Sequence, residues 1–137
     1  TTHQILTLAS IIELEAVSDS DRATVAGVLY NRLNDNWSLG CDATTYYAAK
    51  KSMTESLTQS DLTACNGYNT RCTSMTGLPV GPIDNPSISS IEAALNPTES
   101  DYYYFVADTD KKVYFTKNAT EHDRIIAQLR DEGKWAA

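Results

Sequence analysis

The chain has 137 residues, of which 42% are hydrophobic and 21% are charged, and its formal net charge is −7. These values predict a single domain over residues 1–137 with its own apolar core, and they exclude a disordered or collagen-like chain. The excess of acidic residues argues against binding to nucleic acid or to an anionic membrane surface, whereas a neutral polysaccharide is compatible with it. No stretch of about 18 uninterrupted apolar residues is present, so no membrane-spanning helix is expected.

The first quarter of the chain predicts two consecutive helices. Residues 4–17 are apolar nearly all round the helix, which is typical of a helix buried on most sides. The segment 18–20 then caps a second helix over 21–34, whose apolar residues recur at helical spacing. Because the chain begins at Thr1 without a Met and enters a helix at once, we expect an excised domain or a processed product.

The remainder predicts a long irregular segment followed by helical and strand elements. Short helices are expected at 43–50 and from Thr58, and a turn-rich loop extends to residue 86; ordered loops of this length are usually functional. A helix over 87–95, strands over 102–107 and 113–116, and a last helix from Asn118 to about 132 complete the chain. Helices that come first and a β-hairpin that comes late indicate a mainly helical α+β domain.

Two glutamates near the end of the first helix are candidate catalytic acids. At 100° per residue, Glu13 shares a face with small and apolar residues, whereas Glu15 lies on the other side, nearer the helix end. Burial of a carboxyl disfavours its ionised form, raises its pKa and suits it to general acid catalysis. The pattern weakly favours Glu13. A structural Glu13 paired with Arg22, Arg32 or Arg71 has equal weight.

The long loop carries groups that suit a sugar ligand. Tyr68, Asn69 and Thr70 offer an aromatic ring for the apolar face of a sugar, an amide and a hydroxyl. The alternative is an Asx-turn beside a core tyrosine. Asp42 is a candidate for orienting a loop or binding substrate. The Gly/Pro-rich segment 77–83 indicates a shaped wall rather than a reactive group.

Other motifs are weaker. Tyr103 or Phe105 is a candidate for lining a groove, because alternate side chains of a strand face opposite sides. His122 is interpreted as a surface or capping residue in the first turn of the last helix. The sequence contains no P-loop, dinucleotide-binding glycine motif or nucleophile elbow. Its two His and three Cys match no zinc pattern, so no metal site is expected.

Cys65 and Cys72 enclose the turn-rich segment CNGYNTRC. From the residues alone, a disulfide between them and a pair of ordinary thiols are equally supported. A disulfide would imply an oxidising compartment. Cys41 would then be left unpaired.

Eight sequence blocks occur in an order that resembles a known family. They are LASIIELEA, VAGVLYNRL, LGCDATTYYA, YNT, GLPVGPIDNP, SIEAALNP, YYYFVAD and VYFTKNATEHD, and together they cover about residues 5–130. In this order they resemble the catalytic domain of the MltG (YceG-like) endolytic murein transglycosylases. The chain departs from the family pattern at three positions: Ala43, where the family usually has Pro, Arg71, where it often has Tyr, and Val80, where it often has Pro.

The resemblance implies an activity and a site. It implies lytic cleavage of the β-1,4 bond between N-acetylmuramic acid and N-acetylglucosamine in peptidoglycan, leaving a 1,6-anhydro-muramyl end, with no cofactor. It implies a lysozyme-like groove with the long loop as one wall and Glu13 as general acid and then base. Substrate-binding positions are expected at Asn31, Asp42, Tyr68, Asn69, Thr70, Asn85 and Phe105.

The resemblance also implies a cellular setting. Full-length family members carry a membrane anchor and a LysM-like subdomain, act outside the cytoplasm at the cell envelope, and have cell-wall synthesis proteins as partners. The 137-residue chain itself is expected to contact glycan strands and no membrane. This setting, together with the turn-rich loop, predicts a Cys65–Cys72 disulfide that braces the YNT segment.

Two other functions are weighed against this activity. A non-catalytic glycan-binding module would leave Glu13 purely structural. A pyridoxal-phosphate-dependent aminodeoxychorismate lyase, a label that family members have carried, is disfavoured because the chain is too short and has no Lys in an apolar stretch suited to a Schiff base. We further predict that Tyr68, Asn69 and Thr70 face the same groove as Glu13, with Asn85 near its wall.

Overall fold

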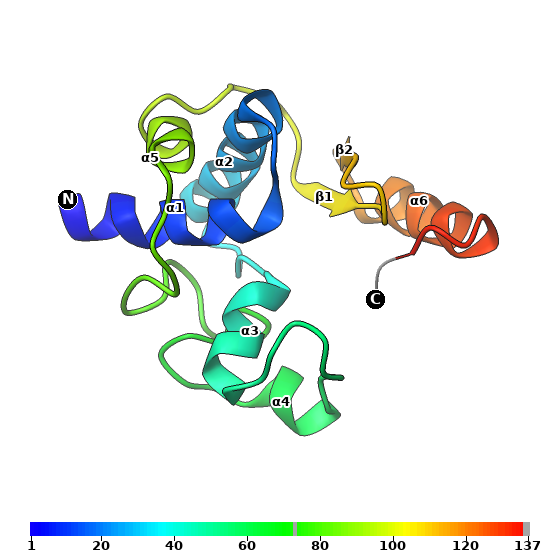
Figure 1. The fold of residues 1–137 in the computed structure, drawn as a ribbon, viewed down its shortest axis with the longest axis horizontal. Helices are drawn as coiled ribbons and strands as arrows, with labels where there is room; N and C mark the ends of the chain where they lie inside the picture. Colours follow the sequence, from blue (N-terminus) through cyan, green and yellow to red (C-terminus); the bar gives the residue numbers. More distant parts are fainter. Residues whose placement is uncertain (73, 136–137) are drawn as a thin grey trace.

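The computed structural model describes residues 1–72 and 74–135. Within these ranges the elements are α1 (Thr2–Glu15), α2 (Asp19–Asn34), α3 (Asp42–Ala49), α4 (Gln59–Thr63), α5 (Ile88–Leu95), β1 (Tyr104–Ala107), β2 (Val113–Thr116) and α6 (Ala119–Asp131) (Figure 1). The predicted α+β class, mainly helical with a late hairpin, is confirmed. None of the described helices is both long enough and apolar enough to cross a membrane.

The helices α1, α2 and α5 pack together and form the core (Figure 1). Leu8, Ile11 and Ile12 of α1 meet Val25 and Leu29 of α2, and each of these side chains is at most 1% exposed. Because α1 is covered on several sides, its sequence has almost no polar face. This burial fixes the end of α1, where both candidate glutamates lie.

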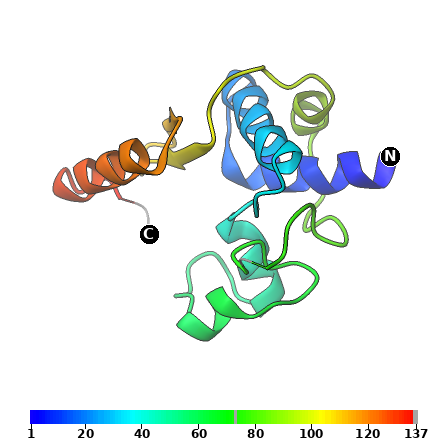
Figure 2. The same cartoon turned by 180° about the vertical axis from the view of Figure 1, so that it is seen from behind.

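A second region, made of α3, α4 and their loops, lies on one side of this core (Figure 2). A disulfide joins Cys65 to Cys72, whose Cα atoms are 5.3 Å apart, and Cys41 is buried and free. The predicted pairing is therefore confirmed. The disulfide closes the loop that contains the YNT segment.

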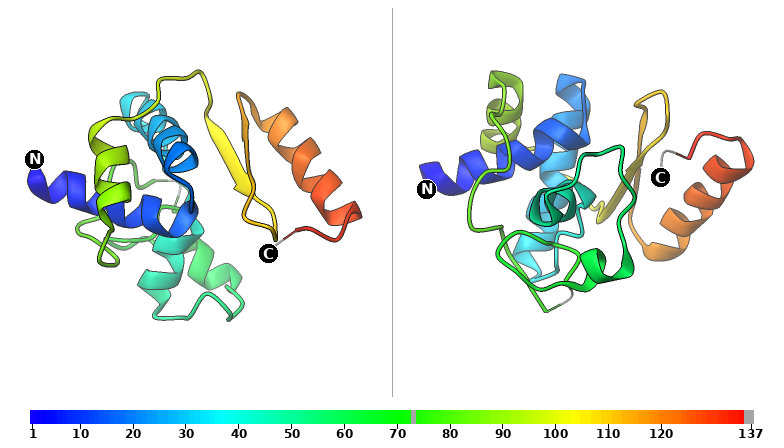
Figure 3. Two further views of the ribbon diagram at one scale, coloured as in Figure 1. Left: turned by 45° about the horizontal axis from the view of Figure 1, so that its top comes forward. Right: turned by 60° about the horizontal axis from the view of Figure 1, so that its bottom comes forward.

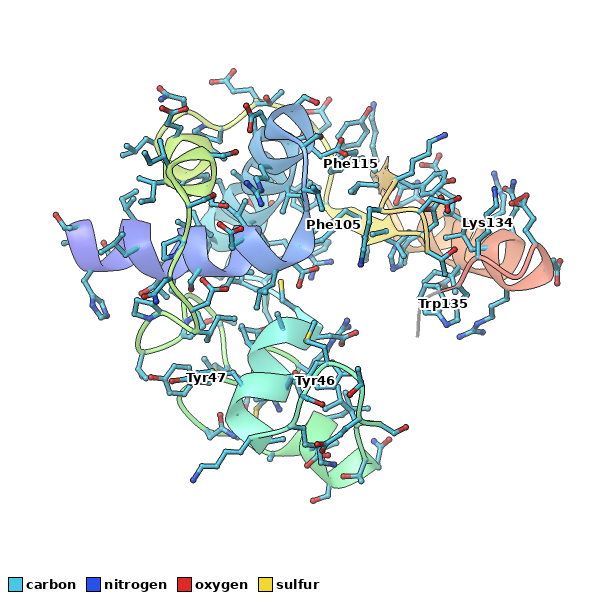
Figure 4. All side chains as sticks on the ribbon, in the orientation of Figure 1. Tyr46, Tyr47, Phe105, Phe115, Lys134 and Trp135 are labelled. Carbon is cyan, nitrogen blue, oxygen red and sulfur yellow. A yellow bond between two sulfur atoms is a disulfide. The ribbon has the colours of Figure 1, made fainter. Side chains whose placement is uncertain are left out.

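The third region is the hairpin with α6 packed against it (Figure 3). In the antiparallel ladder Tyr104 faces Thr116 and Phe105 faces Phe115. Phe105 and Phe115 are half-buried against the helical core (Figure 4), which attaches the hairpin to that core. The chain after α6 returns to the hairpin turn, where Trp135 pairs with Asp108.

The connection from α5 to β1 crosses α2 at a close approach. A Cβ atom on Gly27 would lie 2.0 Å from the carbonyl oxygen of Thr98, so a glycine is required there. Further along, the Asn31 amide donates to the carbonyl oxygens of Ser100 and Tyr102, at 2.9 and 2.8 Å. These contacts guide the chain into β1 beside the end of α2.

Candidate active site

Glu13 is held in a polar network that joins α1, α2 and α5. Its carboxylate accepts hydrogen bonds from the Ser87 N–H at 2.6 Å and the Ser90 hydroxyl at 3.1 Å, and it pairs with the Arg22 guanidinium at 2.9 Å. The bonds from Ser87, and then those from Ser90 and Arg22, lower the pKa of Glu13. The expectation that burial raises this pKa is wrong, and the alternative of an ion pair with Arg22 is confirmed.

Asp84 lies in the same region. Both of its carboxyl oxygens are buried, and neither has a hydrogen-bond partner among the described residues. Burial, and then the charge of Glu13, raises the pKa of Asp84 to about 6. Because both oxygens are shielded from solvent, they are not placed to contact a bound glycan.

Glu15, the last residue of α1, points to the other side of the helix and lies half-buried at the start of α3. Burial, and then the negative charge of Asp42, raises the pKa of Glu15 to about 7, while Arg71 and the backbone amide of Ala43 lower it to a smaller extent. A carboxyl with this pKa is partly protonated at neutral pH. It can therefore donate a proton and later accept one.

Asn69 holds the YNT segment to α4. Its side-chain amide donates to the carbonyl oxygens of Asp61, Leu62 and Ala64 at 3.1, 3.1 and 2.7 Å, which satisfies carbonyls that the end of a helix leaves free. Its side-chain oxygen accepts from the Thr45 hydroxyl at 2.7 Å. Asn69 is fully buried, so the expectation that it contacts substrate is corrected to a structural role.

Thr70 makes the matching connection to α3. Its hydroxyl accepts from the Cys41 N–H at 2.8 Å and lies 2.7 Å from the Thr44 hydroxyl. Thr70 is 1% exposed, so it too braces the fold instead of facing a groove. The next residue, Arg71, emerges from this braced segment and pairs with Asp42 at 2.9 Å.

The other predicted substrate residues are spread over the molecule. Tyr68 lies against Tyr47 of α3, with ring centroids 4.7 Å apart and ring planes tilted by 56°, and Phe105 packs against the core. Figure 4 labels Tyr47 and Phe105. Asn31 binds backbone carbonyls, and Asn85 is exposed two residues before Ser87, on the Glu13 side. Of the predicted set, the structure brings Asp42 to the vicinity of Glu15 but not of Glu13.

A cavity of about 500 Å³ opens where the three regions meet, and it is lined by Arg32, Trp37, Gly40, Arg71, Thr76 and Tyr104. Arg71 and Thr76 belong to the long loop, so this loop supplies one wall, as expected. Segment 77–83 does not line the cavity. It lies along α1, where the Ser10 hydroxyl accepts from the Ile83 N–H at 3.1 Å.

A second and larger cavity, of about 790 Å³, lies against α2 and is lined by Asn31, Leu95 and Asp101 among others. Its asparagine amide is already bonded to Ser100 and Tyr102. Neither glutamate lines either of these two cavities. We place the candidate active site at the smaller cavity because Arg71, which lines it, pairs with Asp42, and the charges of both residues act on Glu15.

Sequence reasoning missed Arg32, Trp37 and Tyr104. The Arg32 guanidinium lies 5.4 Å from the ring centre of Trp37 and 4.9 Å from that of Tyr104. Residues 32 and 104 are far apart in the chain, and no local sequence motif predicts their contact. Only the path of the α5–β1 connection brings them together.

Comparison with known proteins places these features in a family context. Residues 1–128 match the YceG-like family. The chain is 45% identical over 122 residues to a protein of Bacillus subtilis strain 168 and 40% identical over 134 residues to one of Streptococcus pneumoniae strain D39, both named endolytic murein transglycosylase. The matches cover 89% and 93% of this chain but only 33% and 24% of those proteins.

A solved structure agrees with these matches. A YceG-like protein from Listeria monocytogenes superposes with a TM-score of 0.81 at 45% sequence identity. The match covers 90% of this chain and 39% of the Listeria chain. The fold described above is therefore the fold of one part of larger proteins.

Proposed function

Because the chain belongs to the YceG-like family, we propose that it is a lytic transglycosylase of peptidoglycan in which Glu15, rather than Glu13, is the general acid and base. The observation that carries the proposal is a half-buried carboxyl with a pKa of about 7 whose charged neighbour Arg71 lines a cavity together with polar and aromatic residues. The names of the Bacillus and Streptococcus relatives supply the reaction class.

The reaction needs one carboxyl group. Protonated Glu15 gives its proton to the glycosidic oxygen as the bond to C1 of N-acetylmuramic acid breaks. The ionised carboxylate then takes the proton of the C6 hydroxyl, whose oxygen closes on C1 to give the 1,6-anhydro sugar. The leaving sugar keeps the first proton, Glu15 regains the second, and no water is consumed. The substrate thus supplies the nucleophile that a second carboxylate supplies or activates in other glycosidases.

Glu13 is less suited to this cycle. The hydrogen bonds from Ser87 and Ser90 and the ion pair with Arg22 favour its ionised form. A carboxyl with a lowered pKa is deprotonated at neutral pH and gives no proton to a leaving group. Its contacts support a role in fixing α5 to α1.

The test compares matched variants. Glu15→Gln keeps the shape of the side chain and removes the acid, so we expect release of anhydro-muropeptides from purified peptidoglycan to fall by about 10²–10⁴-fold. Glu13→Gln is the control and should keep turnover within about tenfold wherever it remains folded. Mass spectrometry of the digested peptidoglycan measures the anhydro ends, and circular dichroism checks the fold.

Three other outcomes are informative. Loss of anhydro ends in folded Glu13→Gln with normal activity in Glu15→Gln would restore Glu13 as the catalyst. No anhydro ends from the unaltered protein, with retained binding to glycan, would favour the glycan-binding module. Turnover equal to that of the unaltered protein in both variants would contradict a mechanism that depends on a single glutamate.

The same proposal includes the cellular setting. We propose that the chain acts outside the cytoplasm on glycan strands near cell-wall synthesis proteins. The Cys65–Cys72 disulfide supports an oxidising compartment. Cysteine labelling before and after reduction, on protein taken from cells, tests that compartment: without reduction one thiol, that of Cys41, should be labelled after unfolding.

A further inference from the structure

Two guanidinium groups face one small space in the cavity beside Glu15. A Cβ atom built on Gly40 would lie 3.3 Å from Nη1 of Arg32 and 3.8 Å from Nη1 of Arg71. Gly40 has φ +62, a conformation that side-chain-bearing residues rarely adopt, so the backbone leaves this space unfilled. Both cations are therefore directed at a position that no side chain of residue 40 occupies.

The positive charge at this position exceeds the negative charge. Arg71 pairs with Asp42 through Nε and Nη2. In the described part of the chain no carboxylate lies within ion-pair distance of Arg32, whose hydrogen bonds go to the carbonyl oxygens of Ser38, Leu39 and Tyr103. Among the described residues Asp42 is the one carboxylate that pairs with either arginine, so the two guanidinium charges favour a further anion between them.

Aromatic rings complete the cavity. Trp37 and Tyr104 flank the Arg32 guanidinium, and Trp37 remains 38% exposed. An exposed indole ring offers a flat apolar surface on which the apolar face of a sugar can stack. The cavity thus combines a stacking surface with an anion position, which is the chemistry of an acidic sugar.

We propose that this cavity is a subsite for the carboxylate carried by the substituent of a muramyl residue, and that Arg71 sets the preference for the acid over its amide. The inference rests on the proposed function, because a glycan strand bound at Glu15 is what brings a muramyl residue there. The carboxylate has two sources: the free lactyl group of a bare muramyl residue and the α-carboxylate of the glutamate in a stem peptide.

The position of Arg71 supports this selectivity. Its backbone N–H donates to the buried Asn69 side chain at 3.0 Å, so the arginine projects from a fixed point of the braced loop. An arginine fork matches a carboxylate with two parallel hydrogen bonds, whereas an amide offers a single acceptor oxygen and no charge.

Binding of small muramyl ligands tests the inference without catalysis. Calorimetry on the unaltered protein would use N-acetylmuramic acid, N-acetylmuramyl-L-alanyl-D-glutamate with its γ-carboxyl blocked as the methylamide, and the α-amide of that blocked dipeptide, which carries no carboxylate. None of the three contains the bond to be cleaved. We expect an acid to bind about 10–100-fold more tightly than the amide, the range for a charged hydrogen bond. The tighter of the two acids identifies the source of the carboxylate.

Variants assign the preference to Arg71. Arg71→Gln should remove the discrimination between acid and amide, Arg71→Lys should keep part of it, and Arg124→Gln, an equal change of charge on the exposed face of α6, should leave it intact. Equal affinity of the unaltered protein for acid and amide would overturn the inference, and so would full discrimination by folded Arg71→Gln. If Arg71→Gln does not fold, the comparison in the unaltered protein decides.

Turnover separates this inference from the proposed function. Arg71→Gln should raise KM several-fold more on peptidoglycan with free stem carboxylates than on fully amidated strands, while any change in kcat that follows from the loss of the Arg71 charge near Glu15 should be the same on both substrates. A purely structural role of Arg71 would affect both substrates equally and contradict the inference. Failure of the proposed function has a different signature: no anhydro ends from either substrate, with ligand discrimination intact.

Discussion

Glu13 and Glu15, the two acidic residues near the end of α1, have opposite surroundings. We call Glu13 with Arg22, Ser87 and Ser90 the Glu13 cluster, in which every donor points at the carboxylate. Glu15 faces burial and the negative charge of Asp42. One carboxyl has a lowered pKa and the other a raised one, although only two residues separate them.

This difference gives the two glutamates different roles, one in the stability of the fold and the other in proton transfer. A carboxylate that receives several donors stabilises the fold and is a poor proton donor. A carboxyl whose ionised form is disfavoured destabilises the fold at neutral pH and is suited to proton transfer. Substitution of Glu13 should therefore lower stability, and substitution of Glu15 should lower activity.

The largest effect on stability is expected at the loop that positions Arg71. Asn69→Ala removes donors to three carbonyls at the end of α4 and the acceptor for Thr45. We expect the free energy of unfolding to fall by about 3 kcal/mol, because buried partners are left unpaired. Urea unfolding measures the change. A stable Asn69→Ala protein with weakened glycan binding would instead support a direct contact with substrate.

A smaller loss is expected from the Glu13 cluster. Glu13→Gln keeps one acceptor for Ser87 but removes the charge that pairs with Arg22. We expect about 2 kcal/mol lower stability at pH 7, the range for a charged hydrogen bond. Because the pKa of Glu13 is lowered in the folded state, its contribution exists above the unfolded value of 4.5 and fades as pH falls through the folded value. Equal losses at pH 7 and near pH 3 would contradict this assignment.

Sequence reasoning was most successful where the signal was local. Periodicity and caps located the helices, and the turn-rich loop predicted the disulfide only together with the extracytoplasmic setting that the resemblance implies. It named Arg22 as a possible partner of Glu13 but failed on the other donors, which come from residues 87 and 90, more than seventy positions away. It also took Asn69 and Thr70 for ligand contacts, since polar groups that satisfy buried backbone look the same in a sequence as groups that meet a sugar.

The smallest effect has the opposite sign and applies to Glu15. Its pKa is about 7 in the folded state and 4.5 in the unfolded chain, so the folded protein binds the proton more tightly. Stability should therefore decline as pH rises from about 4.5 to 7 and stay reduced above that range. Glu15→Gln removes the ionisable group. One pKa unit corresponds to about 1.4 kcal/mol, and solvent screening of a half-buried carboxyl reduces the effect.

We expect folded Glu15→Gln to be more stable than the unaltered protein by about 1–2 kcal/mol at pH 8 and to differ little at pH 4. Urea unfolding of both proteins at the two pH values measures this, with Glu13→Gln as the control that loses stability at pH 8. A gain that is the same at both pH values would reflect packing and not ionisation. A loss of stability at pH 8 would mean that the Glu15 carboxylate is well solvated or paired, and its suitability as the proton donor would fall with it.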